Sequence, residues 1–180
     1  MSRQKAKGTR METGLVRYLT ASLDDPSGIH RAALAGSSDE GDVHGIRKGA
    51  LVGIAEVKNH RQVTPGLVAG WREETLRERE NAHADFAVLV MHRNGADQTG
   101  NSPSYGRNVV QMTMRDLMIV SGRYDPRDDA DGMHGKAQGT GDAAGVTEGA
   151  HGVVPADGIW VSLDMDTLVT LLNADGIAFG

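Results

Sequence analysis

Four charged side chains in the first third of the chain have the types and spacing to bind a divalent cation. Glu56 and Lys58 are two positions apart at the end of the apolar run ALVGIAEVK, so a strand places both on one face. Asp42 follows a Gly- and Ser-rich stretch, and Glu12 lies among apolar residues. A carboxylate at the edge of a core costs several kcal/mol unless it is paired or bound to a cation.

Three carboxylates and one ammonium indicate a specific chemistry. Carboxylate oxygens are hard ligands that suit Mg²⁺ or Mn²⁺, which take one or two protein carboxylates and keep several waters. Such an ion stabilises charge on phosphoryl oxygens and activates a water, while a lysine orients that water or neutralises the transition state. Phosphodiester cleavage is a reaction that needs such an ion. The alternative is an ordinary cross-strand ion pair between Glu56 and Lys58 on a solvated strand face.

The apolar pattern predicts the elements that would position these residues. Apolar residues recur at helical spacing over 11–23 and place Glu12 beside the buried stripe. Strands are expected at 29–35, briefly at 42–46, and at 50–58.

A second helix and a further strand follow. Thr64 and Pro65 are a typical N-cap and first-turn pair for a helix over 64–81, whose Arg/Glu run at 72–80 is expected to be a solvated face. The continuous apolar run at 85–91 suits a central strand covered on both faces. The order helix, three strands, helix, strand predicts an α/β fold with a mixed central sheet flanked by helices.

Composition divides the chain into a core and two further segments. Residues 1–122 contain the predicted core. The segment 123–157 has almost no large apolar residues and is rich in Gly, Asp and Ala. Such a stretch cannot bury enough apolar surface to offset its ordering entropy, which indicates an insertion or linker. The segment 158–180 is expected to pack on the core, because 161–171 resembles 110–120 as a strand passing into a short helix.

The bulk properties exclude several classes of protein. The 180 residues include no cysteine, which excludes disulfides and thiolate metal sites, and the net charge of −5 provides no global positive field for a polyanion. No apolar run approaches the ~20 residues of a membrane span, and no secretory signal pattern is present. We expect a cytoplasmic protein with no membrane partner.

The first ten residues are locally basic despite the net negative charge. They contain four cations and no acid, namely Arg3, Lys5, Lys7 and Arg10. Directly before the helix of Glu12, these cations suggest an arm that contacts DNA phosphates, with sequence-independent and salt-sensitive affinity. A solubilising tail is the alternative.

Asp42 followed by Glu56-Val57-Lys58, with Glu12 ahead of both, resembles the PD-(D/E)xK nuclease signature. More narrowly, the stretches KAKGTRMETGLVRYL, GSSDEGDVHG and IAEVKNH are similar to archaeal-type Holliday-junction resolvases and to resolvase-like proteins of phages. The similarity covers roughly the first half of the chain.

The resemblance implies a restriction-endonuclease-like core and a Mg²⁺-dependent endonuclease, with Mn²⁺ as a substitute, that resolves branched DNA in a bacterial or phage-infected cytoplasm. It implies metal binding by Asp42, Glu56 and the backbone carbonyl of Val57, a catalytic role for Lys58 and support from Glu12. Since resolvases cut two strands symmetrically, it also implies a homodimer.

Four further residues carry weaker expectations, and a fifth residue departs from the motif. The family's loop serine, which would contact DNA, corresponds to Ser37 or Ser38. His44 is a candidate to contact DNA or a water near the cation, and Gln62 is a candidate to orient such a water. An incidental position is the alternative for each. Gly41 stands where the motif's name expects proline.

Two rival functions remain open at this point. One is a nuclease of the same fold that acts on flaps, ends or linear duplex. The other is a DNA-binding module that has kept the fold without catalysis. Retention of all four charged residues argues against the second, because inward carboxylates are unfavourable in a protein that does not use them.

Overall fold

The computed structural model describes residues 3–32, 40–127 and 158–174, with side chains from residue 8 onward. Its centre is a six-stranded mixed sheet in the order β1-β2-β3-β4-β5-β6, in which only β3 and β4 are parallel neighbours. The strands are β1 (His30–Arg31), β2 (Val43–Lys48), β3 (Leu51–Lys58), β4 (Phe86–Met91), β5 (Val109–Thr113) and β6 (Trp160–Asp164). The helices are α1 (Arg3–Ser22), α2 (Pro65–Asn81), α3 (Met114–Val120) and α5 (Met165–Asn173), with a 3-10 turn η1 (Pro103–Arg107).

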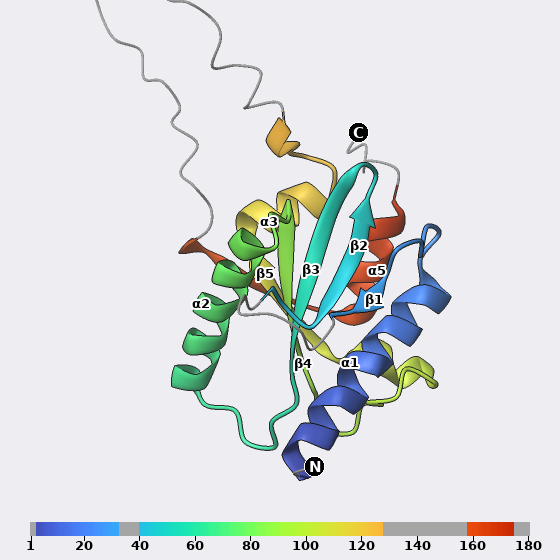
Figure 1. Ribbon diagram of the computed structural model, residues 1–180, viewed down its shortest axis with the longest axis vertical. Coiled ribbons are helices and arrows are strands. Elements are labelled where there is room, and N and C mark those ends of the chain that lie inside the picture. The colour runs from blue at the N-terminus through green and yellow to red at the C-terminus, as the bar shows by residue number, and fades with distance from the viewer. Residues whose placement is uncertain (1–2, 33–39, 128–157, 175–180) are drawn as a thin grey trace, which may run out of the picture.

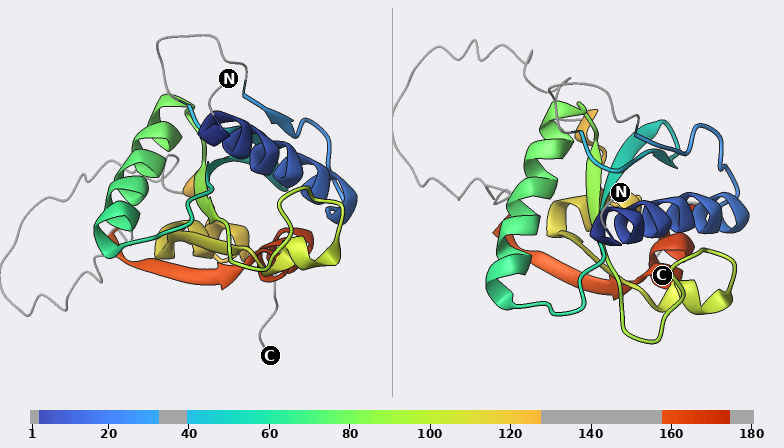
Figure 2. Two further views of the ribbon diagram at one scale, coloured as in Figure 1. Left: turned by 90° about the horizontal axis from the view of Figure 1, so that it is seen from below. Right: turned by 60° about the horizontal axis from the view of Figure 1, so that its bottom comes forward.

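The sheet is covered on both faces, as the expected α/β fold requires (Figure 1). Every residue of β4 is buried, and its side chains alternate between two apolar clusters. Val88 and Val90 belong to the main core with residues of α1, α3 and α5, whereas Leu89 and Met91 pack with Trp71 of α2. Figure 2 shows α1 and α2 on opposite sides of β3 and β4. The central, doubly covered strand is therefore confirmed.

The first helix is longer than the apolar pattern indicates. Its predicted start was residue 11, but α1 begins at Arg3, so the backbone of the expected basic arm is helical. Arg, Gln, Lys and Ala are good helix formers, and they extend the helix beyond its buried stripe. That stripe is confirmed, because Met11, Leu15 and Leu19 are fully buried.

The strand boundaries also differ from the pattern. Of the strand expected at 29–35, the described residues 29–32 contain β1 at His30–Arg31, and 33–35 lie outside the described residues. Strand β2 continues to Lys48. Helix α2 follows the prediction closely, since Thr64 is its N-cap and accepts a hydrogen bond from the amide of Leu67. Most of the predicted insertion, 128–157, lies outside the described residues.

The C-terminal segment completes the fold. β6 pairs antiparallel with β5, and α5 buries Met165 and Leu168 completely in the main core. Among the described residues, no helix is both long and apolar enough to cross a bilayer.

Candidate metal site

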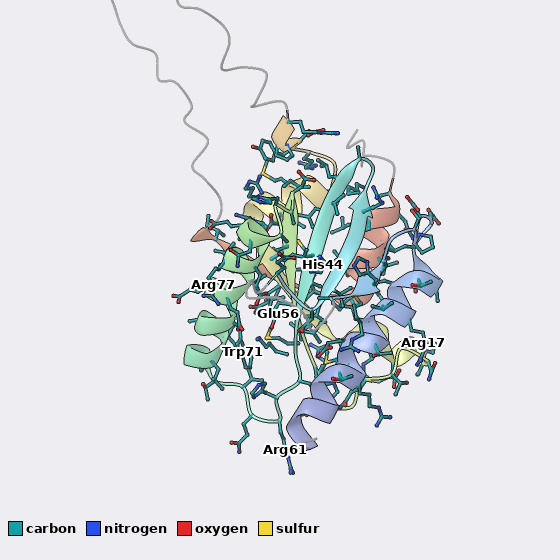
Figure 3. The ribbon with its side chains drawn as sticks, viewed as in Figure 1. Arg17, His44, Glu56, Arg61, Trp71 and Arg77 are labelled. Carbon is teal, nitrogen blue, oxygen red and sulfur yellow. The ribbon has the colours of Figure 1, made fainter. Side chains whose placement is uncertain are left out.

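Asp42 and Glu56 come together where the chain enters β2 beside β3. Oδ2 of Asp42 accepts a hydrogen bond from the amide of Val57 at 2.9 Å, and its carboxyl group lies close enough to that of Glu56 for the two groups to interact electrostatically. Glu56 is only 6% exposed. Figure 3 shows it at the centre of the molecule, between α1 and α2. The amide of Val57 thus positions Asp42, while metal binding by the carbonyl oxygen of Val57 stays a prediction.

Gly41 explains how Asp42 reaches this position. Its φ is +92°, in the left-handed region, and a Cβ there would lie 3.1 Å from Cδ1 of Ile54. Proline is locked near a φ of −65° and cannot adopt this conformation. The local backbone therefore requires glycine where the motif's name has proline.

Lys58 lies between two carboxylates from different elements. Its Nζ pairs with Oε1 of Glu56 and, at 2.8 Å, with Oε2 of Glu74 on α2. The lysine side chain is 15% exposed. The sequence pattern predicted the contact with Glu56, but it did not predict the contact with Glu74.

Two acids of α2 complete the cluster, and they correct the expectation of a solvated face at 72–80. Glu78 is fully buried, and Glu56, Glu74 and Glu78 each offer an oxygen within 4.8 Å of the others. The missed signal was helical spacing from Trp71, because positions 74, 75 and 78 follow it at i+3, i+4 and i+7 and share its buried face.

The electrostatics of the site favour binding of a proton or a cation. Burial, followed by the negative charges of Glu56 and Glu12, raises the pKa of Asp42 to about 8. Burial also raises the pKa of Glu56, although Lys58 opposes this effect. Burial acts to lower the pKa of Lys58, but its ion pairs with Glu56 and Glu74 outweigh burial and raise it.

Glu12 lies at the side of this cluster and has its own cation. Arg31 of β1 donates from Nε to Oε2 of Glu12 at 3.0 Å, and a second guanidinium nitrogen contacts the same oxygen. The carboxylate of Glu12 is 14% exposed. The structure thus places Glu12 close enough to act on Asp42, with Arg31 as a partner that the sequence pattern did not indicate.

The remaining candidate residues are distributed more widely. His44 is partly buried and its ring centroid lies 5.8 Å from that of His30, and Gln62 is exposed in the loop before α2. Arg10 is exposed on α1. The side chains of Arg3, Lys5 and Lys7, and all of Ser37 and Ser38, lie outside the described part of the structure.

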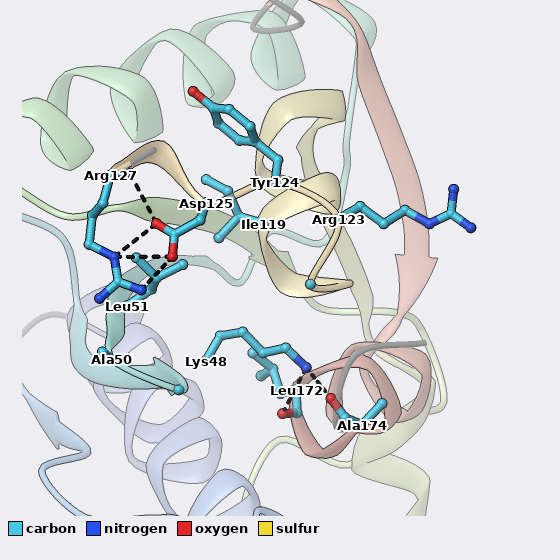
Figure 4. A pocket seen from close by; sticks show the side chains of 12 residues that line it. Lys48, Ala50, Leu51, Ile119, Arg123, Tyr124, Asp125, Arg127, Leu172 and Ala174 are labelled. Atoms are coloured by element: carbon cyan, nitrogen blue, oxygen red, sulfur yellow. Dashed lines mark hydrogen bonds and ion pairs between the residues drawn. The ribbon is translucent and has the colours of Figure 1, made fainter. Parts of the chain in front are cut away.

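A separate open pocket of about 400 Å³ lies between the β2–β3 turn, the end of α3 and the end of α5 (Figure 4). Nζ of Lys48 donates there to the carbonyl oxygen of Leu171 at 2.7 Å, and Arg127 pairs with Asp125. These cations are bound within the protein, and neither Asp42 nor Glu56 lines the pocket. The carboxylate cluster is therefore the stronger candidate site.

The cluster has the donor set of a site for a hard divalent cation. It offers carboxylate oxygens from β3, from the residue before β2 and from α2, and the trio Glu56, Glu74 and Glu78 could hold a metal ion. The donor set does not select one metal, because Mg²⁺, Mn²⁺ and Ca²⁺ all prefer oxygen ligands. Comparisons of this chain with protein-family models, with curated proteins and with solved structures gave no significant match.

Proposed function

We propose that this protein is a Mg²⁺-dependent DNA endonuclease with a restriction-endonuclease-like core, and that it acts on branched DNA such as the Holliday junction. The observation that carries the proposal is the joint placement of Asp42, Glu56 and Lys58. Two electrostatically interacting carboxyl groups and one ammonium meet at adjoining strands, with the amide of Val57 aligning the first carboxyl group. This combination suits hydrolysis of a phosphodiester better than it suits a structural ion pair.

Each of these residues has a distinct role in the proposed reaction. Asp42 and Glu56 would hold the divalent cation, which supplies charge stabilisation for the phosphoryl oxygens and activation of a water. Lys58 would orient that water and neutralise charge that develops on the phosphate. Glu12, held by Arg31, adds negative charge at the side of the site and strengthens the attraction for a cation.

The choice of DNA rests on the chemistry and on the cations near the start of α1. Arg3, Lys5, Lys7 and Arg10 occur on the helix that also carries Glu12. Such positive charge would bind the backbone of the DNA that the proposed site cleaves. The choice of branched DNA rests on the resemblance to resolvases alone, so the substrate must be tested directly.

The direct test is a cleavage assay with a four-way junction, a flap and a linear duplex in parallel, with Mg²⁺ and with EDTA. We expect Mg²⁺-dependent cleavage with the junction cut fastest. Equal cleavage of all three DNAs would retain the nuclease and exclude the resolvase. Junction binding without cleavage under any metal would favour the non-catalytic module.

A homodimer is the expected assembly, because closed two-fold symmetry would present two sites to a junction with related arms. The mass of the protein in solution, alone and with junction DNA, tests this part. A protein that stays monomeric on junction DNA would exclude the symmetric two-cut mechanism.

A further inference from the structure

The contact between Lys58 and Glu74 joins two different elements of the fold. Lys58 ends β3 and already pairs with Glu56 two positions earlier on the same strand. Its second ion pair, at 2.8 Å, crosses to Glu74 on α2. The ammonium is therefore shared between a carboxylate proposed to bind the cation and one from another layer of the fold.

A divalent cation bound by Glu56 would change this arrangement. The cation and the ammonium are both positive and compete for the same carboxylate, so Lys58 loses attraction to Glu56 when the cation binds. A lysine has a flexible four-carbon stem, and without a second partner its ammonium would leave for solvent. Glu74 is the second partner that the structure supplies.

Helix α2 holds Glu74 in place through contacts other than the one with Lys58. Trp71, one turn earlier, packs with Leu89 and Met91, and the ring of His60 lies 4.9 Å from its ring. The hydroxyl of Thr75 donates to the carbonyl oxygen of Trp71 at 2.8 Å. The backbone that carries Glu74 is thus anchored to the sheet by contacts that do not involve Lys58.

We propose that Glu74 is a positioning residue that retains the ammonium of Lys58 beside the reacting phosphate when a divalent cation occupies Glu56. This inference rests on the proposed function. Its rival is that Glu74 is itself a cation ligand, because its carboxylate lies near those of Glu56 and Glu78. The two roles predict different responses to the same substitutions.

The experiment measures cleavage by Glu74→Gln, by Lys58→Met and by the variant that combines both substitutions. The control is Glu73→Gln, because Glu73 is an exposed glutamate on the same helix. If Glu74 acts through Lys58, E74Q lowers kcat by roughly 10- to 100-fold, as expected for a misplaced reacting group. It leaves the Mg²⁺ affinity measured by calorimetry without DNA unchanged or tighter. Adding E74Q to K58M then causes no further loss, because both substitutions remove one interaction. E73Q behaves as the wild type.

A second measurement does not depend on activity. The side-chain ammonium signal of Lys58 in nitrogen-15 NMR, assigned by its absence in K58M, should persist on addition of Mg²⁺ to the wild-type protein and disappear in E74Q through exchange with water. Survival of the signal in both proteins would overturn the inference. So would weaker Mg²⁺ binding by E74Q together with a further loss in the double variant, since that pattern identifies a ligand.

The two proposals fail in distinguishable ways. A wild-type protein that binds Mg²⁺ and shows the expected NMR behaviour but cleaves no DNA overturns the proposed nuclease and supports retention of Lys58 by Glu74. If the wild type cleaves DNA and E74Q keeps the full kcat of the wild type, only the inference about Glu74 is overturned. Absence of Mg²⁺ binding by the wild type overturns both.

Discussion

The carboxyl groups of Asp42 and Glu56 lie close together at the edge of the core, and the negative charge of Glu56 raises the pKa of Asp42. Two ionised carboxylates so close together repel each other, so the pair favours binding of a proton or a cation. Glu78 is fully buried in the same cluster as Glu56. Repulsion between these carboxylates therefore lowers the stability of the metal-free protein at the site proposed to bind the metal.

Removing one charge of this pair should separate activity from stability. Asp42→Asn retains an oxygen for the amide of Val57 and adds a donor for Glu56, so we expect cleavage to fall to background while metal-free stability rises by about 1–2 kcal/mol. Urea unfolding in EDTA and the junction cleavage assay measure the two effects.

Asp164→Ala is a control for this prediction. Asp164 caps α5 by accepting from the amide of Thr167 at 2.8 Å, so its loss should lower stability by about 1 kcal/mol and leave cleavage unchanged. Wild-type cleavage by D42N would show that Asp42 is not a metal ligand.

The stability of the metal-free protein should fall as pH rises because of Asp42. Its pKa is about 8 in the folded protein against an ordinary 3.8. Between these values the folded state keeps a proton that the unfolded chain has lost, so stability decreases with pH by at most about 1.4 kcal/mol per unit from this group.

Urea unfolding from about pH 4.5 to about pH 9.5, with EDTA, measures this dependence. The advantage of D42N over the wild type should grow across the range and level off above pH 8. Mg²⁺ should reduce the difference, because the cation replaces the proton. Parallel curves for the two proteins would contradict the raised pKa.

Two helical glycines should respond to alanine with opposite signs. A Cβ at Gly14 of α1 would lie 2.3 Å from the carbonyl oxygen of Gln98, whereas a Cβ at Gly70 of α2 would meet nothing within 4 Å. Alanine in a helix gains about 1 kcal/mol over glycine, so G70A should stabilise the protein by about that amount.

G14A should destabilise the protein, because backbone atoms of the loop before η1 must move. Thermal unfolding of both variants tests the packing of that loop on α1, and stabilisation by G14A would contradict it.

Affinity for DNA should depend on the cations of α1. Replacing Arg3, Lys5, Lys7 and Arg10 with Gln should reduce the slope of log K against log salt by up to ~0.9 per lost phosphate contact. Titrations with junction and linear duplex at several salt concentrations, in the cleavage-deficient D42N background, measure this change. An unchanged slope would assign these residues to solubility, and equal affinity for both DNAs would exclude selection of branched DNA.

The sequence determined the elements and the central pair of the site. Burial of a continuous apolar run predicted β4, the Thr64-Pro65 pair predicted the start of α2, and period two placed Glu56 and Lys58 on one face. These features depend on residues close together in the chain, because local backbone geometry decides the secondary structure and the face on which each side chain lies. The start of α1 was less accurate, because residues with high helix propensity extend the helix beyond its buried stripe.

Only the tertiary structure decided which partners surround that pair. Glu74 and Glu78 looked like part of a solvated charge run, and Arg31 had no indicated role. Packing of α2 through Trp71 turns the two glutamates toward the sheet, and pairing of β1 with β2 brings Arg31 to Glu12. The physical reason is that a side chain's charge and spacing are set by the sequence, whereas its burial and its ion-pair partner depend on residues distant in the chain that packing brings alongside.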